Sequence, residues 1–443
     1  YALGILVNGS NKLYAIRKDS PLIIGVSNDG NYIASDVFAI LNETNKYIVL
    51  DNNEVVILDN KVNVYNDGVL VDKKILTFNH KADEITKNGY SHFMLKEIHE
   101  QDNLAKKLID MYLENKDTII NKMPCFDKYE KIDIVACGSA YHAGMIGKSL
   151  IEEYGDIPVS VNLASEYRYK KLFLNDKTLV IAISQSGETA DTLASVNIAK
   201  QNNADTLGIV NVALSSIARA CDNVLYTNAG PEIAVATTKA YSMQVLMLSL
   251  IALNIGVSKN LIDKDKLDYI INNYRLLPSK IKEEINKNYS NIAKQIYNKN
   301  DIFFIGRNVD YALAMEGSLK LKEISYLHAE SYAAGELKHG TISLIEEGTP
   351  VIAIVTDDKI YEKTISNIKE VKARGANVIL ITNDKLDVNG DFYDSKIVVS
   401  NLHNLVNSLI TIVPLQLIAY EVAKMKNLDI DKPRNLAKSV TVE

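Results

Sequence analysis

The sequence predicts an α/β protein with two tandem domains, each a parallel sheet in a three-layer α/β/α sandwich, preceded by a β-rich segment. Three observations support this prediction. Residues 1 to about 72 alternate apolar and polar side chains, which is typical of antiparallel strands. Beyond residue 115, short Val- and Ile-rich runs alternate with helix-length segments. These runs fall into two matching sets, which indicates a repeat.

The β-rich segment spans residues 1–72. Turn-forming pairs separate its expected strands, at Asn8-Gly9, Asp29-Gly30 and Asp67-Gly68. Residues 73–115 are charged and helical in pattern, and we expect them to form a connecting segment. The chain opens at Tyr1, inside an expected strand, which suggests a truncated or processed chain.

Two α/β domains are expected over residues 116–275 and 276–428, followed by a polar tail over 429–443. The strands of the first read "IDIVACG", "TLVIAIS" and "TLGIVNV"; those of the second read "DIFFIG", "TPVIAIV" and "ANVILIT". Gly138 matches Gly306 and Thr178 matches Thr349, with nearly equal offsets. Convergence of two ordinary α/β units is the alternative, but duplication explains the spacing better.

Composition excludes several classes of protein. Apolar residues make up 47% of the 443 residues and charged residues 23%, with a net charge of −6, which argues against a disordered chain and a nucleic-acid binder. We find no apolar run as long as a membrane span and no signal pattern. Three scattered cysteines are too few for a disulfide framework or a zinc site, so we expect a reducing, cytoplasmic setting.

The loop after the run "TLVIAIS" is the first candidate site. It carries Ser184, Gln185, Ser186 and Thr189 around a glycine, where a strand turns into a helix. Backbone N–H groups and hydroxyls at such a turn can surround a phosphate. Plain helix capping is the alternative. In the second copy the equivalent loop reads "VTDD", whose carboxylates would repel a phosphate.

Two further loops of the first copy are expected near the same crevice. They read "CGSAYHAG" and "EIAVATTKAY", the second with Val235, Thr237, Thr238 and Lys239. No glycine-rich nucleotide motif occurs at a strand-to-helix turn. The sequence therefore favours a small phosphorylated metabolite over a nucleotide.

The second copy offers titratable groups. Glu316, Lys320 and Glu323 share one face of an expected helix, where a carboxylate beside an amine can move a proton next to a carbonyl. A solvated ion pair is the alternative. His339 can titrate near neutral pH, although a lone histidine is more often structural. By composition the tail is loose and its Lys438 solvated.

Together, the motifs resemble the isomerase half of the glucosamine-6-phosphate synthase family (glutamine–fructose-6-phosphate transaminases, isomerizing). The residues that carry the resemblance are "SQSGETADTL", "VATTKAY", "EGSLKLKEISYLHAESYAAGELKHG" and "PRNLAKSVTVE", and the match covers essentially the whole chain. The resemblance implies a glutaminase domain followed by two sugar isomerase (SIS) domains. It also implies dimers or larger assemblies with shared sites.

The resemblance assigns binding residues for fructose 6-phosphate and glucosamine 6-phosphate. Ser184, Gln185, Ser186 and Thr189 would hold the sugar phosphate. Val235 and Thr237 would line the sugar site, Thr237 standing where many members have Ser. Ser139 keeps one hydroxyl of the family's "CGTS" motif, and Ala140 loses the other, so one hydrogen bond worth ~1 kcal/mol is in doubt.

The resemblance also assigns the reaction. Glu323 would move a proton between C1 and C2, and Lys320 would assist at the C1 oxygen. His339, from the partner subunit of a homodimer, would open the sugar ring. Lys438, on a tail that would fold over the sugar as a lid, would form a Schiff base with the C2 carbonyl, which ammonia then displaces. No metal or organic cofactor is required.

Residues 1–72 resemble only the last strands of the family's glutaminase domain, whose nucleophile is an N-terminal cysteine. We therefore expect that this chain cannot hydrolyse glutamine. A non-catalytic phosphosugar-binding regulator is an alternative, disfavoured because a binder need not keep Glu323, His339 and Lys438 together. A deglycase acting on sugar-phosphate amines is a third possibility, disfavoured by the ending "AKSVTVE".

Overall fold

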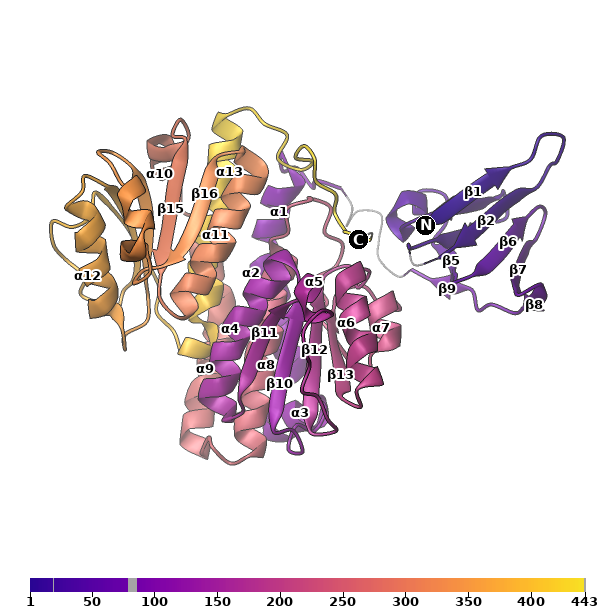
Figure 1. Cartoon of the computed structure of the whole chain (residues 1–443), viewed down its shortest axis with the longest axis horizontal. Helices are drawn as coiled ribbons and strands as arrows, with labels where there is room; N and C mark the ends of the chain where they lie inside the picture. Colours follow the sequence, from indigo (N-terminus) through magenta and orange to yellow (C-terminus); the bar gives the residue numbers. More distant parts are fainter. Residues whose placement is uncertain (19, 79–85, 442–443) are drawn as a thin grey trace. The chain divides into compact units, whose positions relative to one another are not determined.

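The computed structural model describes residues 1–18, 20–78 and 86–441, and the side chain of Phe38 is not described. It confirms the α/β class with two parallel sheets (Figure 1). The chain divides into two compact units. The first comprises Tyr1–Asn88 with residues 188–190 and the chain from residue 439 onward, and the second comprises Gly89–Gly187 and Asp191–Lys438.

The first unit contains two antiparallel sheets, ordered β1-β2-β6-β7-β8 and β4-β3-β5-β9. Their strands are β1 (Ala2–Leu6), β2 (Leu13–Arg17), β3 (Ile23–Val26), β4 (Asn31–Ala34), β5 (Lys46–Val49), β6 (Glu54–Leu58), β7 (Val62–Asn66), β8 (Val69–Val71) and β9 (Leu76–Thr77). The three turns predicted from Asn-Gly and Asp-Gly pairs join β1 to β2, β3 to β4 and β7 to β8. Ile24, Leu50 and Val56 lie in its buried core.

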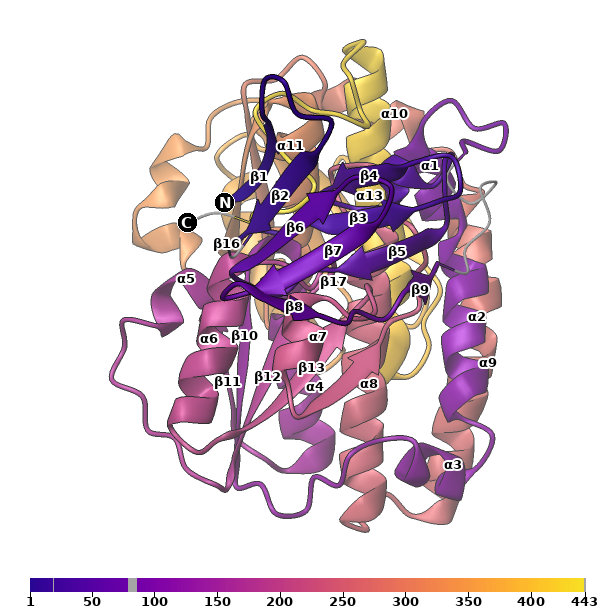
Figure 2. The ribbon, with the colours of Figure 1, turned by 90° about the vertical axis from the view of Figure 1, so that its right-hand side faces the viewer.

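The segment expected to connect the units is largely part of the second unit's core. Residues 79–85 of that segment lie outside the described residues. After them, α1 (Phe93–His99) and α2 (Gln101–Tyr112) pack against α9 (Lys264–Ile285), and α2 also lies along α8 (Lys239–Ser258) (Figure 2). The apolar face of α2, with buried Leu108 and Ile109, accounts for this packing.

The second unit holds two five-stranded parallel sheets of the same topology, ordered β11-β10-β12-β13-β14 and β16-β15-β17-β18-β19. Their strands are β10 (Lys131–Ala136), β11 (Val159–Leu163), β12 (Thr178–Ser184), β13 (Asp205–Val210), β14 (Asn223–Tyr226), β15 (Asp301–Gly306), β16 (His328–Ala333), β17 (Pro350–Val355), β18 (Asn377–Asn383) and β19 (Ser395–Val399). The matching order of the two sheets supports the predicted duplication.

Sequence reasoning missed the four strands at the sheet edges, β11, β14, β16 and β19. An edge strand has one neighbour and one better-solvated flank, so it does not require a continuous apolar run. The β16 sequence "HAESYA" has a single buried residue, Ala329. The central β12 and β17 are buried at every position, which is why their sequences were recognisable.

Helices cover both sheets. In the first half, α4 (Gly138–Gly155) packs against α8, and in the second half, α11 (Val309–Ser325) packs against α13 (Asn404–Met425). The remaining helices are α3 (Lys116–Asn121), α5 (Ala164–Tyr167), α6 (Ala190–Gln201), α7 (Ser216–Ala220), α10 (Ser290–Ile296) and α12 (Tyr361–Lys372), with 3-10 turns η1 (Val37–Ile40), η3 (Leu337–His339) and η4 (Thr341–Leu344).

Two helices correct an expectation from the sequence. Both α8 and α13 are long and apolar enough to cross a membrane by length and composition, so the statement that no apolar run reaches that length was wrong. In the structure their most apolar windows are 100% and 94% buried, as in helices packed inside a protein core.

Candidate active site

The loop after β12 is held in shape by its own residues. The Ser184 hydroxyl accepts a hydrogen bond from the Gly187 N–H at 3.0 Å, and the Gly187 carbonyl accepts one from the Ile217 N–H at 2.9 Å. Gly187 has φ +66°, and a Cβ there would lie 1.9 Å from Ser215 Oγ. This position therefore requires glycine.

The four residues predicted to hold phosphate fall in different settings. Ser184 is buried and shapes the loop, while Gln185 and Ser186 are half-buried and accessible. The Gln185 carbonyl accepts a hydrogen bond from the Asn211 N–H at 3.2 Å. Thr189 is half-buried and belongs to the first unit, so its placement against Ser184–Ser186 is not described.

The equivalent loop of the second domain contains an internal anion. The carboxylate of Asp310, a buried residue at the start of α11, accepts hydrogen bonds from the Thr356 N–H at 2.8 Å and the Thr356 hydroxyl at 2.5 Å. Burial raises the Asp310 pKa to about 6, although these hydrogen bonds act to lower it. Sequence reasoning noted the acidic "VTDD" loop but missed Asp310.

Glu316, Lys320 and Glu323 lie on one face of α11, as their spacing predicted. The Lys320 Nζ is 2.5 Å from Glu323 Oε2 and 3.5 Å from Glu316 Oε1. The side chains of Lys320 and Glu316 are 0% exposed and that of Glu323 is 21% exposed, so the alternative of a solvated ion pair is wrong. Burial alone would lower the Lys320 pKa, but Glu323 and Glu316 raise it above its usual value.

Helix α4 of the first domain contacts this group. The Ser139 hydroxyl donates to Glu316 Oε1 at 2.8 Å, and His142 Nδ1 lies 2.7 Å from Glu316 Oε2. His142 was missed, although it stands three residues after Ser139, on the same face of α4. Ala140 is half-buried and packs against the core.

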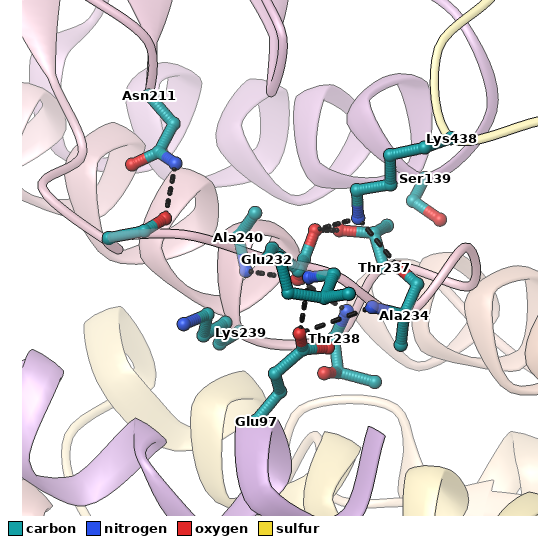
Figure 3. A network of polar contacts seen from close by, with 12 residues as sticks. Glu97, Ser139, Asn211, Glu232, Ala234, Thr237, Thr238, Lys239, Ala240 and Lys438 are labelled. Carbon is teal, nitrogen blue, oxygen red and sulfur yellow. Dashed lines mark hydrogen bonds and ion pairs between the residues drawn. The ribbon is translucent and has the colours of Figure 1, made fainter. Parts of the chain in front are cut away.

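Lys438 is not a solvated residue of a loose tail. Its Nζ lies 2.5 Å from Glu232 Oε2 and donates to the Ala234 carbonyl at 2.8 Å (Figure 3). The Thr237 hydroxyl donates to the same Glu232 oxygen at 2.6 Å. A second contact joins the tail to the loop before α8: the Val235 N–H donates to the Asp431 carbonyl at 2.9 Å. The structure thus brings Lys438, Thr237 and the backbone of Val235 together.

Glu232 is the central residue of this cluster, and sequence reasoning missed it. Its Oε1 accepts hydrogen bonds from the N–H groups of Thr238 and Ala240, both at 3.0 Å, where α8 begins. Burial alone would raise the Glu232 pKa, but the Lys438 ammonium and these donors lower it to about 2. An acidic residue shortly before a helix start was the available signal.

A second buried carboxyl supports the same loop from α1. Glu97 Oε1 accepts hydrogen bonds from the Ile233 N–H at 2.5 Å and the Ala234 N–H at 3.2 Å. Burial and the neighbouring Glu232 charge raise the Glu97 pKa to about 8, so this acid is protonated at neutral pH. The nearby Lys239 lies in an ion pair with Glu100 at 2.7 Å.

His339 is not brought to the other predicted residues. It ends the turn η3, its side chain is exposed, and its N–H donates to the Glu336 carbonyl at 2.9 Å. Within the described ranges, the structure shows no hydrogen bond or ion pair from its ring to Glu323, Lys320 or Lys438.

This arrangement suits carbonyl chemistry. It supplies an amine with a buried counter-charge (Lys438 and Glu232) and a carboxylate paired with an ammonium (Glu323 and Lys320). Over the part of the chain that the structure describes, no group of three His, Cys, Asp or Glu side chains is placed to hold a metal ion.

Comparison with known proteins defines the class first. The family model described as "SIS domain" matches residues 126–254 and 295–425, so the chain is a protein of two SIS domains. It is 47% identical to the glutamine–fructose-6-phosphate aminotransferases (isomerizing) of Clostridium acetobutylicum and Caldanaerobacter subterraneus subsp. tengcongensis, over 100% of this chain and 74% of each relative.

A solved structure agrees with these relatives. The C-terminal domain of glucosamine-fructose-6-phosphate aminotransferase from Francisella tularensis is 38% identical to this chain, with a TM-score of 0.72. The match covers 79% of this chain and 99% of that one. The chain belongs to the family of isomerizing glutamine–fructose-6-phosphate aminotransferases.

Proposed function

We propose that this chain converts D-fructose 6-phosphate to D-glucosamine 6-phosphate, by amination coupled to ketose–aldose isomerisation. The names of its relatives support the substrate and the reaction. The observation that carries the proposal is the placement of Lys438. Its amine, on the C-terminal tail, contacts Glu232, and the Thr237 hydroxyl donates to the same Glu232 oxygen. A protein that only binds phosphosugars has no need of this half-buried amine paired with a buried carboxylate.

We assign substrate binding to the loops of the first SIS domain. Ser184, Gln185, Ser186 and Thr189 take the 6-phosphate, and the accessible Gln185 and Ser186 fit this role best. Ser139, Val235 and Thr237 take the sugar. Since Ser139 and Thr237 donate to carboxylates here, the sugar would compete for their hydroxyls.

We assign the chemistry to four side chains. Lys438 forms a Schiff base at C2, because an iminium accepts ammonia more readily than a ketone does. Glu323 then moves a proton between C1 and C2, and Lys320 assists at the C1 oxygen. His339, which is exposed in this chain, opens the sugar ring in the site of a neighbouring subunit. The scheme uses no metal or organic cofactor.

The nitrogen source and the setting are part of the same proposal. In the relatives' named reaction the nitrogen comes from glutamine, and free ammonia serves for the test below. We expect a cytoplasmic homodimer that binds neither nucleic acid nor membrane.

The deciding experiment incubates the chain with fructose 6-phosphate, with and without ammonia, and measures glucose 6-phosphate and glucosamine 6-phosphate. We expect glucosamine 6-phosphate only with ammonia, and its loss in Lys438→Ala and Glu323→Gln. Lys432→Ala is the matched control, because this tail lysine is exposed. If the sugar binds but neither product forms, the proposal is wrong and a regulatory phosphosugar binder is favoured.

A further inference from the structure

The Glu232 carboxylate lies at the reacting end of Lys438, and the reaction as assigned above gives it no role. Its side chain is 0% exposed, and both of its oxygens are hydrogen-bonded. We propose that Glu232 is the counterion of the protonated Schiff base, holding a positive charge at Lys438 Nζ before and after the bond to C2 forms. This inference rests on the proposed function.

The carboxylate is fixed in place by groups that stay when Lys438 moves. Oε1 is bound by the N–H groups of Thr238 and Ala240, and Oε2 by the Thr237 hydroxyl. These donors are neutral, and Lys438 is the cation in direct contact with the carboxylate. An ionised carboxylate buried without a cation is strongly unfavourable, so Glu232 favours states in which Nζ keeps its charge.

Schiff-base formation at C2 conserves that charge. The ammonium and the ketone give the iminium and one water: R–NH₃⁺ + O=C → R–NH⁺=C + H₂O. A proton leaves the ammonium so that the amine can attack C2, and the C2 oxygen departs as water. Glu232, 2.5 Å from Nζ, stays ionised during this step, and the proton passes to the departing C2 oxygen. Ammonia then adds to C2, a proton passes from the added nitrogen to Nζ, and Lys438 leaves as its ammonium: R–NH⁺=C + NH₃ → R–NH₃⁺ + HN=C.

The other charged groups around Glu232 do not take over this task. Glu97 reaches the same loop from α1, but its hydrogen bonds come from the Ile233 and Ala234 N–H groups rather than from Lys438, and burial and Glu232 raise its pKa. Lys239 at the start of α8 is paired with Glu100. From α11, Lys320 adds its charge to the field at Glu232 but lies within the Glu316 and Glu323 pairs. Glu232 therefore carries the negative charge in contact with Lys438.

The test traps the iminium with cyanoborohydride, which reduces a protonated Schiff base to a stable secondary amine. Trapped Lys438 gains the mass of fructose 6-phosphate less one oxygen atom, which peptide mass spectrometry detects. The trapping rate is measured as a function of pH. Trapping falls where the protonated Schiff base loses its proton, and the midpoint of that fall is the quantity compared between variants.

The comparison is made in a Glu97→Gln background, because removing the Glu232 charge also removes one of the causes that raise the Glu97 pKa. We expect wild type and Glu97→Gln to share one midpoint. In Glu97→Gln/Glu232→Gln we expect the midpoint to fall by about one pH unit or more. Gln keeps an oxygen for Thr238 and Ala240 and removes the charge. Glu232→Asp, which withdraws the charge by one methylene, should fall between.

The outcomes separate three cases. An unchanged midpoint in the double variant overturns the counterion role. The counterion role is also overturned if the double variant loses trapping at every pH and its residues 432–441 exchange amide hydrogens faster. That result would mean that Glu232 only anchors the tail. If wild type itself forms no adduct at Lys438, the Schiff-base chemistry of the proposed function fails, and this inference falls with it. If the double variant does not fold, Glu232→Asp decides on the same criterion.

Discussion

The Ser139 hydroxyl donates a hydrogen bond to Glu316 Oε1 at 2.8 Å, joining α4 of one SIS domain to α11 of the other. Glu316 lies 3.5 Å from Lys320 Nζ, and Lys320 contacts Glu323. A residue predicted to touch the sugar thus also supports the group predicted to move the proton. The proposed sugar-binding Ser139 and the proposed proton-transfer pair of Lys320 and Glu323 are thus connected through one buried carboxylate.

We predict that Glu316→Gln lowers stability substantially. Removing one partner from a buried ion pair costs about 3–5 kcal/mol, and somewhat less here because Lys320 keeps Glu323. Chemical unfolding followed by fluorescence measures the change. Lys106 and Asp110 form a matched i,i+4 pair on α2 that is 65% and 61% exposed, so Asp110→Asn should change little. Equal effects of the two variants would contradict the prediction.

We predict that Gly187→Ala weakens binding of fructose 6-phosphate by about tenfold or more, because the new Cβ would displace Ser215 and reshape the phosphate loop. Isothermal titration calorimetry measures the affinity. Gly230 is the control: it has a similar φ of +65° but open space around a Cβ. Gly230→Ala should therefore cost only backbone strain and leave the affinity nearly unchanged. Comparable losses in both variants would assign the effect to strain alone.

We predict that Glu97→Gln becomes relatively more stable as pH rises. The folded-state pKa of Glu97 is raised to about 8, so in wild type its proton favours folding at low pH. That contribution declines by up to about 1.4 kcal/mol per pH unit from the unfolded pKa, near 4.5, to about pH 8. The variant lacks this decline. The melting temperature of Glu97→Gln should therefore rise relative to that of wild type as the pH is raised in steps across this window. A difference in melting temperature that stays constant with pH would show that Glu97 is ionised throughout.

We predict that Asp310→Ala destabilises the second domain by about 2–4 kcal/mol, because the buried N–H and hydroxyl of Thr356 lose their acceptor. Asp310→Asn keeps one oxygen and should cost less. With the Asp310 pKa raised to about 6, wild type also loses stability from about pH 4 to about pH 6, and neither variant should show this loss. Thermal unfolding across that range checks both statements, and an Asp310→Asn variant as unstable as Asp310→Ala would refute the first.

Local patterns predicted much of the fold and part of the site. Helical spacing predicted that Glu316, Lys320 and Glu323 share one face. Continuous apolar runs predicted the central strands, which are buried on both faces of their sheets. The edge strands were not predicted, because solvent on one flank of an edge strand permits polar residues such as those of β16.

Pairings between distant residues could not be predicted in this way. Lys438 meets Glu232 across 206 residues, and no periodicity or turn pattern encodes this contact. The composition of the tail indicated solvation, and only the family resemblance gave Lys438 a role. Asp310 and Glu97 were missed for the same reason: their partners are backbone N–H groups supplied by other elements.

The hydrogen bonds of Asp310 distinguish the proposed phosphate-binding loop of the first SIS domain from the equivalent loop of the second. The second domain supplies its own anion to the loop after β17, and this anion is covalently part of the first turn of α11. The α11 helix is therefore anchored to that loop by a side chain of its own, without a bound phosphate. The loop after β12 is shaped instead by the Ser184 hydroxyl and leaves Gln185 and Ser186 accessible. We infer that a phosphosugar would order the first domain more than the second.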